Sequence, residues 1–178
     1  DHAGLLELDG SAVPGTPLRQ LLALDDTIFT LKLTPNLAHH LSVLGIAREV
    51  SALTGSPLAI PLVPTAAVSI PDTLPVRIEA HDLCGRFSGR IVRGINPAAA
   101  TPAWMVERLA RCGQRPVNAI VDISNYVMFE LGQPTHIFDL AKVGHGLQVR
   151  WAREGETLKL LNGQTITLDP QVGVIADE

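Results

Sequence analysis

Cysteine is scarce in this sequence, which has only Cys84 and Cys112 among its 178 residues. The two are too far apart to form a Cys-x-x-Cys pair, so the sequence excludes a zinc knuckle and a disulfide framework. We therefore expect reduced thiols and a cytoplasmic protein. Long apolar runs are also missing, because prolines interrupt the most apolar stretch, residues 56–70. A membrane helix needs roughly 20 uninterrupted apolar residues, so we predict no membrane span.

Positive charge is not in excess either. Lys and Arg number 14 against 18 Asp and Glu, which gives a formal net charge of −4. A chain of this charge does not bind nucleic acid through its overall field, so RNA contact would require a local groove. The sequence is instead 46% hydrophobic and 18% charged, which is enough to bury a core and excludes disorder along the whole chain. It begins with Asp rather than Met, and we expect it to be a piece of a longer protein.

The first 55 residues predict a small helical unit. Thr16 and Pro17 are residue types that cap and open a helix, and leucines follow them at helical spacing. Residues 27–33 alternate apolar and polar side chains closely enough to predict a strand. Asn36 then predicts the cap of a longer helix, which we expect to end at Gly55.

Residues 56–75 contain five prolines and predict an extended linker. Beyond it, residues 76–80 alternate strictly, and residues 87–95 carry β-branched side chains between glycines. Both patterns are typical of strands. Residues 101–113 begin with Thr-Pro, end with Gly and predict a helix that covers the sheet.

Residues 117–131 fit two interpretations. The apolar spacing, with Asn118 as a cap and Gly132 as a stop, favours a helix. The β-branched content favours a strand instead. We predict the helix and keep the strand as the alternative.

The last segment predicts a β-hairpin. Residues 157–161 and 164–168 flank an Asn-Gly pair, which suits a two-residue turn because both residues tolerate left-handed backbone conformations. A further apolar run, residues 172–176, predicts another strand. Together these elements predict an α+β protein, in which a small helical unit and a linker precede a partial mixed or antiparallel sheet with covering helices.

Common catalytic motifs are absent from the sequence. It has no Gly-x-Ser-x-Gly elbow, no His-Glu-x-x-His, no P-loop and no Gly-x-Gly-x-x-Gly after a strand. His39 and His40 are adjacent, so on a helix their side chains would diverge by about 100° and could not share a metal ion. We interpret them as surface histidines. No phosphate cradle or carboxylate cluster for ATP-driven chemistry is visible.

One block, residues 115–139, is dense in polar residues within an apolar frame. Buried amides and charges are costly without partners, so the block predicts either an internal hydrogen-bond network or a polar pocket. His136 could accept or donate a proton, position a water molecule or have a structural role. Arg115 either pairs with Asp122 or Glu130, or contacts a phosphate or ester oxygen.

Several blocks of the sequence resemble the β subunit of bacterial phenylalanyl-tRNA synthetase. Two of them are Val-Asp-Ile-Ser-Asn-Tyr-Val-Met at 121–128 and Gly-Gln-Pro-x-His-x-Phe-Asp at 132–139, and others lie at 34–36, 41–49, 102–105 and 113–116. The resemblance covers essentially the whole chain in one colinear order.

The resemblance implies a domain organisation. Residues 1–55 would be a small helical unit of the β-subunit core, following an inserted tRNA-binding domain of the OB type. Residues 56–75 would be a proline-rich linker, and residues 76–178 the N-terminal half of the tRNA-editing domain.

The resemblance also implies a function and partners. The family works as an (αβ)₂ heterotetramer with tRNA(Phe), and its α subunit holds the aminoacylation site that uses ATP and Mg. No cofactor is therefore expected in this chain. The β-subunit editing domain hydrolyses tyrosine wrongly esterified to tRNA(Phe). Such a second site is needed because a hydrophobic pocket rejects an added hydroxyl group only weakly.

Matching motifs imply four site residues. His136 would orient a water molecule or the ester, and Arg115 and Asn125 would hold polar groups of the substrate end. Phe138 would flank the aminoacyl ring or the adenine. Whether His136 transfers a proton is left open, because a hydroxyl of the terminal ribose of the tRNA could do so instead.

The sequence departs from the family in two places. Leu37, His39 and His40 replace a charged helix start, and no segment matches the later strand whose glutamate reads the tyrosine hydroxyl. We therefore expect the fragment alone to be an incomplete enzyme.

Two alternatives to editing stay open: a non-catalytic scaffold that docks the α subunit or tRNA, and a stand-alone hydrolase of small esters.

Overall fold

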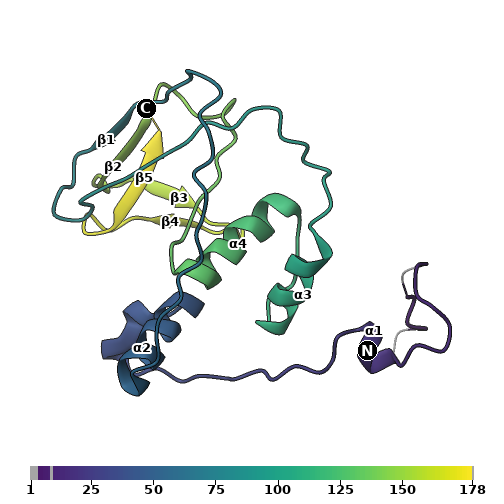
Figure 1. Ribbon diagram of the computed structural model, residues 1–178. Coiled ribbons are helices and arrows are strands. Elements are labelled where there is room, and N and C mark those ends of the chain that lie inside the picture. The colour runs from purple at the N-terminus through teal and green to yellow at the C-terminus, as the bar shows by residue number, and fades with distance from the viewer. Residues whose placement is uncertain (1–3, 9, 178) are drawn as a thin grey trace. The chain divides into compact units, whose positions relative to one another are not determined.

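The computed structural model describes residues 4–8 and 10–177. The chain divides into two compact units, residues 1–38 and 39–178, and each is described by itself. In the first unit, helix α1 spans Leu18–Leu21 (Figure 1). The predicted helix is present, but Pro17 is its N-cap residue and no side chain caps it, so the predicted capping role of Thr16 is wrong.

The predicted strand at 27–33 is also wrong, because these residues form neither helix nor strand. Ile28 and Phe29 are 62% and 78% exposed. A strand is stabilised by hydrogen bonds to a neighbouring strand, and none of the described strands pairs with this segment.

The long helix predicted from Asn36 is divided in two. The 3₁₀ segment η1 spans Pro35–His40 and is kinked at Leu37, and the α-helix α2 spans Val43–Thr54. The cap of α2 is Ser42, whose Oγ accepts a hydrogen bond from the Gly45 amide at 2.9 Å. The backbone of His40 lies so close that a Cβ on Gly45 would meet it at 2.7 Å. The tight turn between η1 and α2 therefore requires glycine, and Gly55 ends α2 with φ +73° as predicted.

Residues 56–75 contain no helix or strand, as their prolines predict. The strand predicted at 76–80 is confirmed as β1, Val76–Ile78. The strand predicted at 87–95 is wrong, since these residues are irregular and Val92 is 60% exposed. The neighbour of β1 in the sheet is a later segment of the chain.

Two further helices follow. Helix α3 spans Ala103–Arg111 and α4 spans Ala119–Leu131, so the helix interpretation of 117–131 is confirmed. Asn118 caps α4 by accepting a hydrogen bond from the Val121 amide at 3.0 Å, and Gly132 ends it with φ +75°.

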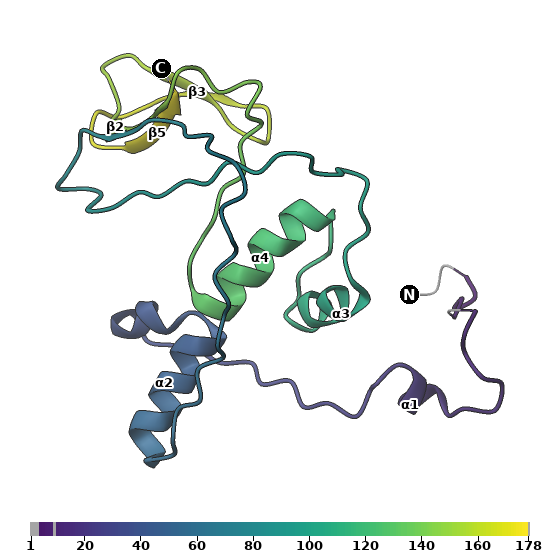
Figure 2. The ribbon, with the colours of Figure 1, turned by 45° about the horizontal axis from the view of Figure 1, so that its top comes forward.

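Helix α4 packs against both α2 and α3 (Figure 2). At its end, a Cβ on Gly132 would lie 3.1 Å from Ser42 Oγ at the start of α2. We expected the helices to cover the sheet. Among the described residues they contact one another instead, and α3 buries Met105 and Leu109.

The main sheet has the order β1-β2-β5, where β2 is Leu147–Trp151 and β5 is Gly173–Asp177. Strand β1 is parallel to β2, with Val76 opposite Leu147, and β5 is antiparallel to β2, with Asp177 opposite Leu147. Strand β5 confirms the last predicted strand. Strand β2 was not predicted, although Leu147–Trp151 alternates apolar and polar residues. In the structure its first four residues are all buried, and these include the polar Gln148 and Arg150.

The predicted hairpin is confirmed as β3, Thr157–Lys159, paired with β4, Thr165–Thr167. Its turn differs from the expected two-residue form. The Gly163 amide donates to Leu160 O at 2.9 Å, the Leu160 amide donates to Gln164 O at 2.7 Å, and Gly163 has φ +86°. This is a three-residue loop in which glycine alone takes the left-handed conformation.

The α+β class is confirmed, and no helix among the described residues is long and apolar enough to cross a membrane.

Candidate functional site

Helix α4 organises the polar block that the sequence singles out. Arg115 lies in the loop before the helix, Asn125 lies within it, and His136 and Phe138 lie in the segment after it. Two side chains of α4, Asp122 and Ser124, hold these flanking segments by hydrogen bonds.

Asp122 is fully buried, with 0% of its surface exposed. Its Oδ2 accepts a hydrogen bond from Thr101 Oγ1 at 2.5 Å, and its Oδ1 accepts one from the Val117 amide at 2.9 Å. Both carboxylate oxygens therefore have partners, as a buried charge requires. The bond to Val117 attaches the end of the Arg115 loop to α4.

Arg115 itself is exposed. Its predicted pairing with Asp122 or Glu130 is wrong, since no ion pair or hydrogen bond joins Arg115 to either carboxylate among the described residues. Asp122 instead accepts from Thr101 and Val117, and Glu130 accepts from Tyr126 Oη at 3.3 Å. The contact of Arg115 with a phosphate or ester oxygen stays a prediction.

Ser124 holds the segment on the other side of α4. Its Oγ donates a hydrogen bond to Thr135 O at 3.0 Å and lies 2.7 Å from Thr135 Oγ1. His136 follows directly and is exposed. The centroid of its ring lies 4.5 Å from that of Phe138, with the planes tilted by 49°. Phe138 is 38% exposed, so the two rings form a contact pair at the surface.

Asn125 is half-buried and lies next to Ser124 on α4. The structure thus brings His136 and Phe138 into contact, and it attaches the two segments that carry Arg115, His136 and Phe138 to the helix that carries Asn125. Within residues 4–8 and 10–177, no hydrogen bond joins Arg115 or Asn125 to His136. The assignment of these residues to a site stays a prediction.

A cluster of side chains between α3 and α4 was not anticipated. Tyr126 Oη accepts a hydrogen bond from Arg108 Nη1 at 2.6 Å, and the Tyr126 ring meets Trp104 edge to face at 5.2 Å between centroids. The Arg108 guanidinium lies 5.2 Å from the Trp104 ring centroid. The sequence contained a signal for this cluster, because residues four apart share one face of a helix. The pairs with this spacing are Trp104 with Arg108 and Tyr126 with Glu130. This cluster fixes the helix that carries Asn125.

The clearest electrostatic perturbation lies outside the polar block. Arg150 on β2 makes two hydrogen bonds to Glu156, at 2.8 and 2.9 Å. These bonds, with a further one from the Arg153 amide, lower the pKa of Glu156 from 4.5 to about 2. The pair joins the main sheet to the start of the hairpin and has a structural role.

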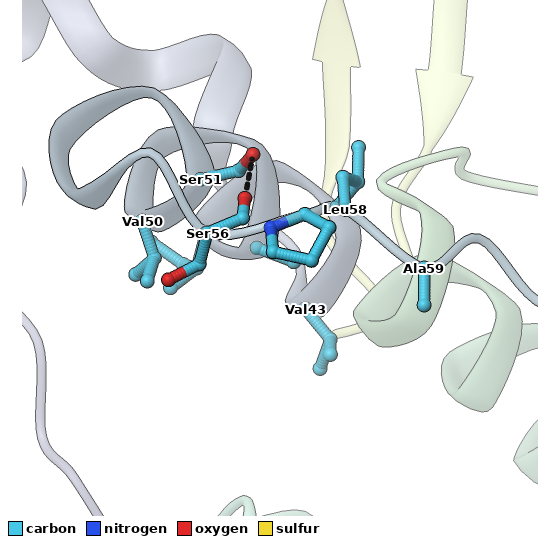
Figure 3. A pocket seen from close by; sticks show the side chains of 9 residues that line it. Val43, Val50, Ser51, Ser56, Leu58 and Ala59 are labelled. Carbon is cyan, nitrogen blue, oxygen red and sulfur yellow. Dashed lines mark hydrogen bonds between the residues drawn. The ribbon is translucent and has the colours of Figure 1, made fainter.

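A groove of about 400 Å³ lies along α2, where the chain turns back after the helix (Figure 3). Its lining is mainly apolar and contains none of the four predicted site residues: Val43, Ile46, Ala47, Val50, Ser51, Ser56, Pro57, Leu58 and Ala59. Ser51 Oγ donates to Ser56 O at 2.7 Å and closes the turn. Among the residues that the structure describes, no three His, Cys, Asp or Glu side chains are grouped closely enough to hold a metal ion.

Comparison with known proteins places this arrangement in a family. Residues 83–178 match the B3/4 domain. The chain is 63% identical over 175 residues to the phenylalanine–tRNA ligase β subunit of Bordetella pertussis, covering 98% of this chain and 22% of that protein. It is 61% and 59% identical over 178 residues to the β subunits of Cupriavidus pinatubonensis and Ralstonia nicotianae, again covering 22% of each.

The resemblance inferred from the sequence motifs is therefore confirmed. The chain spans about a fifth of the length of the curated relatives that it matches. Because the B3/4 match covers more than half of its residues, including α3, α4 and the segments that carry the polar block, the chain belongs to the B3/4 domain family.

Proposed function

We propose that this chain is part of a phenylalanine–tRNA ligase β subunit and that its B3/4 segment hydrolyses tyrosine wrongly attached to tRNA(Phe). The observation that carries the proposal is the polar block around α4, which lies within a segment closely similar to β subunits of that ligase. The partners in this proposal are the α subunit, which performs the ATP- and Mg-dependent aminoacylation, and tRNA(Phe), in an (αβ)₂ heterotetramer in the cytoplasm.

The exposed side chains of the block suit ester hydrolysis. The reaction needs an oriented water molecule or ester and a group that stabilises charge on the carbonyl oxygen. His136 is exposed on a segment attached to α4, so it can approach a bound ester and orient the ester or the attacking water. Phe138, in contact with the His136 ring, offers an apolar surface to the aminoacyl ring or the adenine.

Arg115 and Asn125 supply polar contacts to the same substrate. The Arg115 guanidinium carries a permanent charge and forms strong hydrogen bonds to phosphate or ester oxygens. Asn125 can donate and accept hydrogen bonds at once. Asn125 lies on α4, and the Arg115 loop is attached to the same helix through the bond from Val117 to Asp122.

The proposal is tested with His136→Ala in the full-length β subunit assembled with its α subunit. We expect hydrolysis of Tyr-tRNA(Phe) to slow by about a hundredfold or more, the usual contribution of a positioned acid–base or water-orienting group. Phenylalanine charging should stay within about twofold. His81→Ala removes another exposed histidine outside the polar block and serves as the matched control. Editing that is unchanged in His136→Ala would refute the assignment.

The scaffold alternative rests on a different observation. Helix α4 exposes several apolar side chains, among them Ile123 at 50% and Met128 at 37%. If α4 mainly docks another part of the synthetase, Ile123→Ser should weaken heterotetramer assembly in sedimentation measurements while leaving hydrolysis per assembled enzyme unchanged.

A further inference from the structure

Two hydrogen bonds between Ser124 and Thr135 form a closed pair. Ser124 has a single hydroxyl proton, which is directed to Thr135 O at 3.0 Å. The contact of 2.7 Å between the two hydroxyl oxygens is then made by the Thr135 proton, with Ser124 Oγ as acceptor. Each hydroxyl thus donates once, and Thr135 is held at both its main chain and its side chain.

This pair attaches an otherwise loosely held segment. Within the described residues, the bonds to Ser124 are the only hydrogen bonds that join residues 133–138 to the rest of the protein. The segment begins after Gly132, which ends α4, and the next anchored residue is Asp139, whose Oδ1 accepts from the Ala141 amide at 3.1 Å. Its position relative to α4 therefore depends strongly on Ser124.

We propose that Ser124 is a positioning residue, which sets the place of His136 relative to Asn125 by holding Thr135. This inference rests on the proposed editing function. Thr135 precedes His136 directly, and adjacent Cα atoms are about 3.8 Å apart, so a shift at Thr135 passes to the histidine. Asn125 is adjacent to Ser124 on a rigid helix. Ser124 is thus the direct link between the helix that carries one site residue and the segment that carries the other.

The test measures hydrolysis of Tyr-tRNA(Phe) by the full-length heterotetramer with Ser124→Ala. We expect kcat to fall about tenfold or more with KM within about twofold, because misplacement of a reacting group lowers the rate after the substrate is bound. Ser124→Thr keeps the hydroxyl and should restore most of kcat. Thr135→Val keeps the main-chain acceptor and should have a smaller effect than Ser124→Ala.

A matched control is Ser51→Ala, which removes a hydroxyl that also ties a helix to the segment after it, by a bond of 2.7 Å to Ser56 O. We expect no change in hydrolysis. The double variant Ser124→Ala with His136→Ala separates the roles: if Ser124 acts through His136, its loss should cost nothing further once the histidine is gone.

The outcomes distinguish this inference from the proposed function. Loss of hydrolysis in His136→Ala with unchanged kcat in Ser124→Ala would overturn the positioning role and leave editing in place. A further drop in the double variant would overturn it too, since Ser124 would then act independently of the histidine. Unchanged hydrolysis in His136→Ala would overturn both.

Discussion

The buried carboxylate of Asp122 permits a quantitative prediction about the support of the Arg115 loop. Asp122→Ala would leave the Thr101 hydroxyl and the Val117 amide without their acceptor. Hydrogen bonds to charged groups contribute about 1.5–3 kcal/mol each, and part of this is recovered where water reaches the freed donor. Residue Val117 is 69% exposed and Thr101 is half-buried, so the Val117 amide is expected to recover more of this energy than the Thr101 hydroxyl. We therefore expect a net loss of about 3 kcal/mol in the local stability of α4.

Amide hydrogen exchange in the full-length β subunit measures this loss directly. A change of about 3 kcal/mol corresponds to exchange that is roughly a hundredfold faster at Val117 and across the first turn of α4. Asp122→Asn should cost only about 1 kcal/mol, since the amide oxygen still accepts from Val117 and the amide nitrogen can donate to the Thr101 hydroxyl. Thr101→Val removes one bond and should fall between the two.

The differences in exchange rate between the Asp122 variants are as informative as the size of the change in any one of them. If Asp122→Ala left exchange at Val117 within about twofold of the native rate, the carboxylate would not be the support of this loop. If Asp122→Asn were as damaging as Asp122→Ala, the negative charge rather than the hydrogen-bond geometry would be the important property.

Two further predictions concern the stability of the fold. Because the hydrogen bonds from Arg150 lower the pKa of Glu156 to about 2, this pair stabilises the fold fully above about pH 4.5 and progressively less as the pH falls toward 2. In an acid-unfolding titration, Glu156→Gln should remove the loss of unfolding free energy that this carboxylate causes between about pH 4.5 and 2. A titration curve identical to that of the native protein would show that the pair does not stabilise the fold. Gly132→Ala places a Cβ 3.1 Å from Ser42 Oγ at a positive φ, whereas Gly55→Ala has a similar φ of +73° and open space. Amide exchange should show a cost of about 1–2 kcal/mol for Gly55→Ala and a larger one for Gly132→Ala, and equal costs would show that the helix contact is not tight.

Local sequence determined most of the helices and the hairpin. Asn118 and Gly132 mark the ends of α4, and Gly55 ends α2, because capping bonds and left-handed stops involve residues within one turn. The hairpin followed from residues 162 and 163 for the same reason, although the loop proved one residue longer than predicted. The motifs also identified the family and located the polar block.

Tertiary structure decided what depends on distant partners. Strand β2 forms because it lies between β1 and β5, whereas the segments 27–33 and 87–95 carry strand-like patterns but pair with none of the described strands. The partners of Asp122 and Ser124 were likewise invisible in the sequence, since Thr101 is 21 residues from the first and Thr135 is 11 residues from the second. Helix ends depend on bonds within a few residues, whereas strand pairing and buried hydrogen bonds depend on which remote segments the fold brings together.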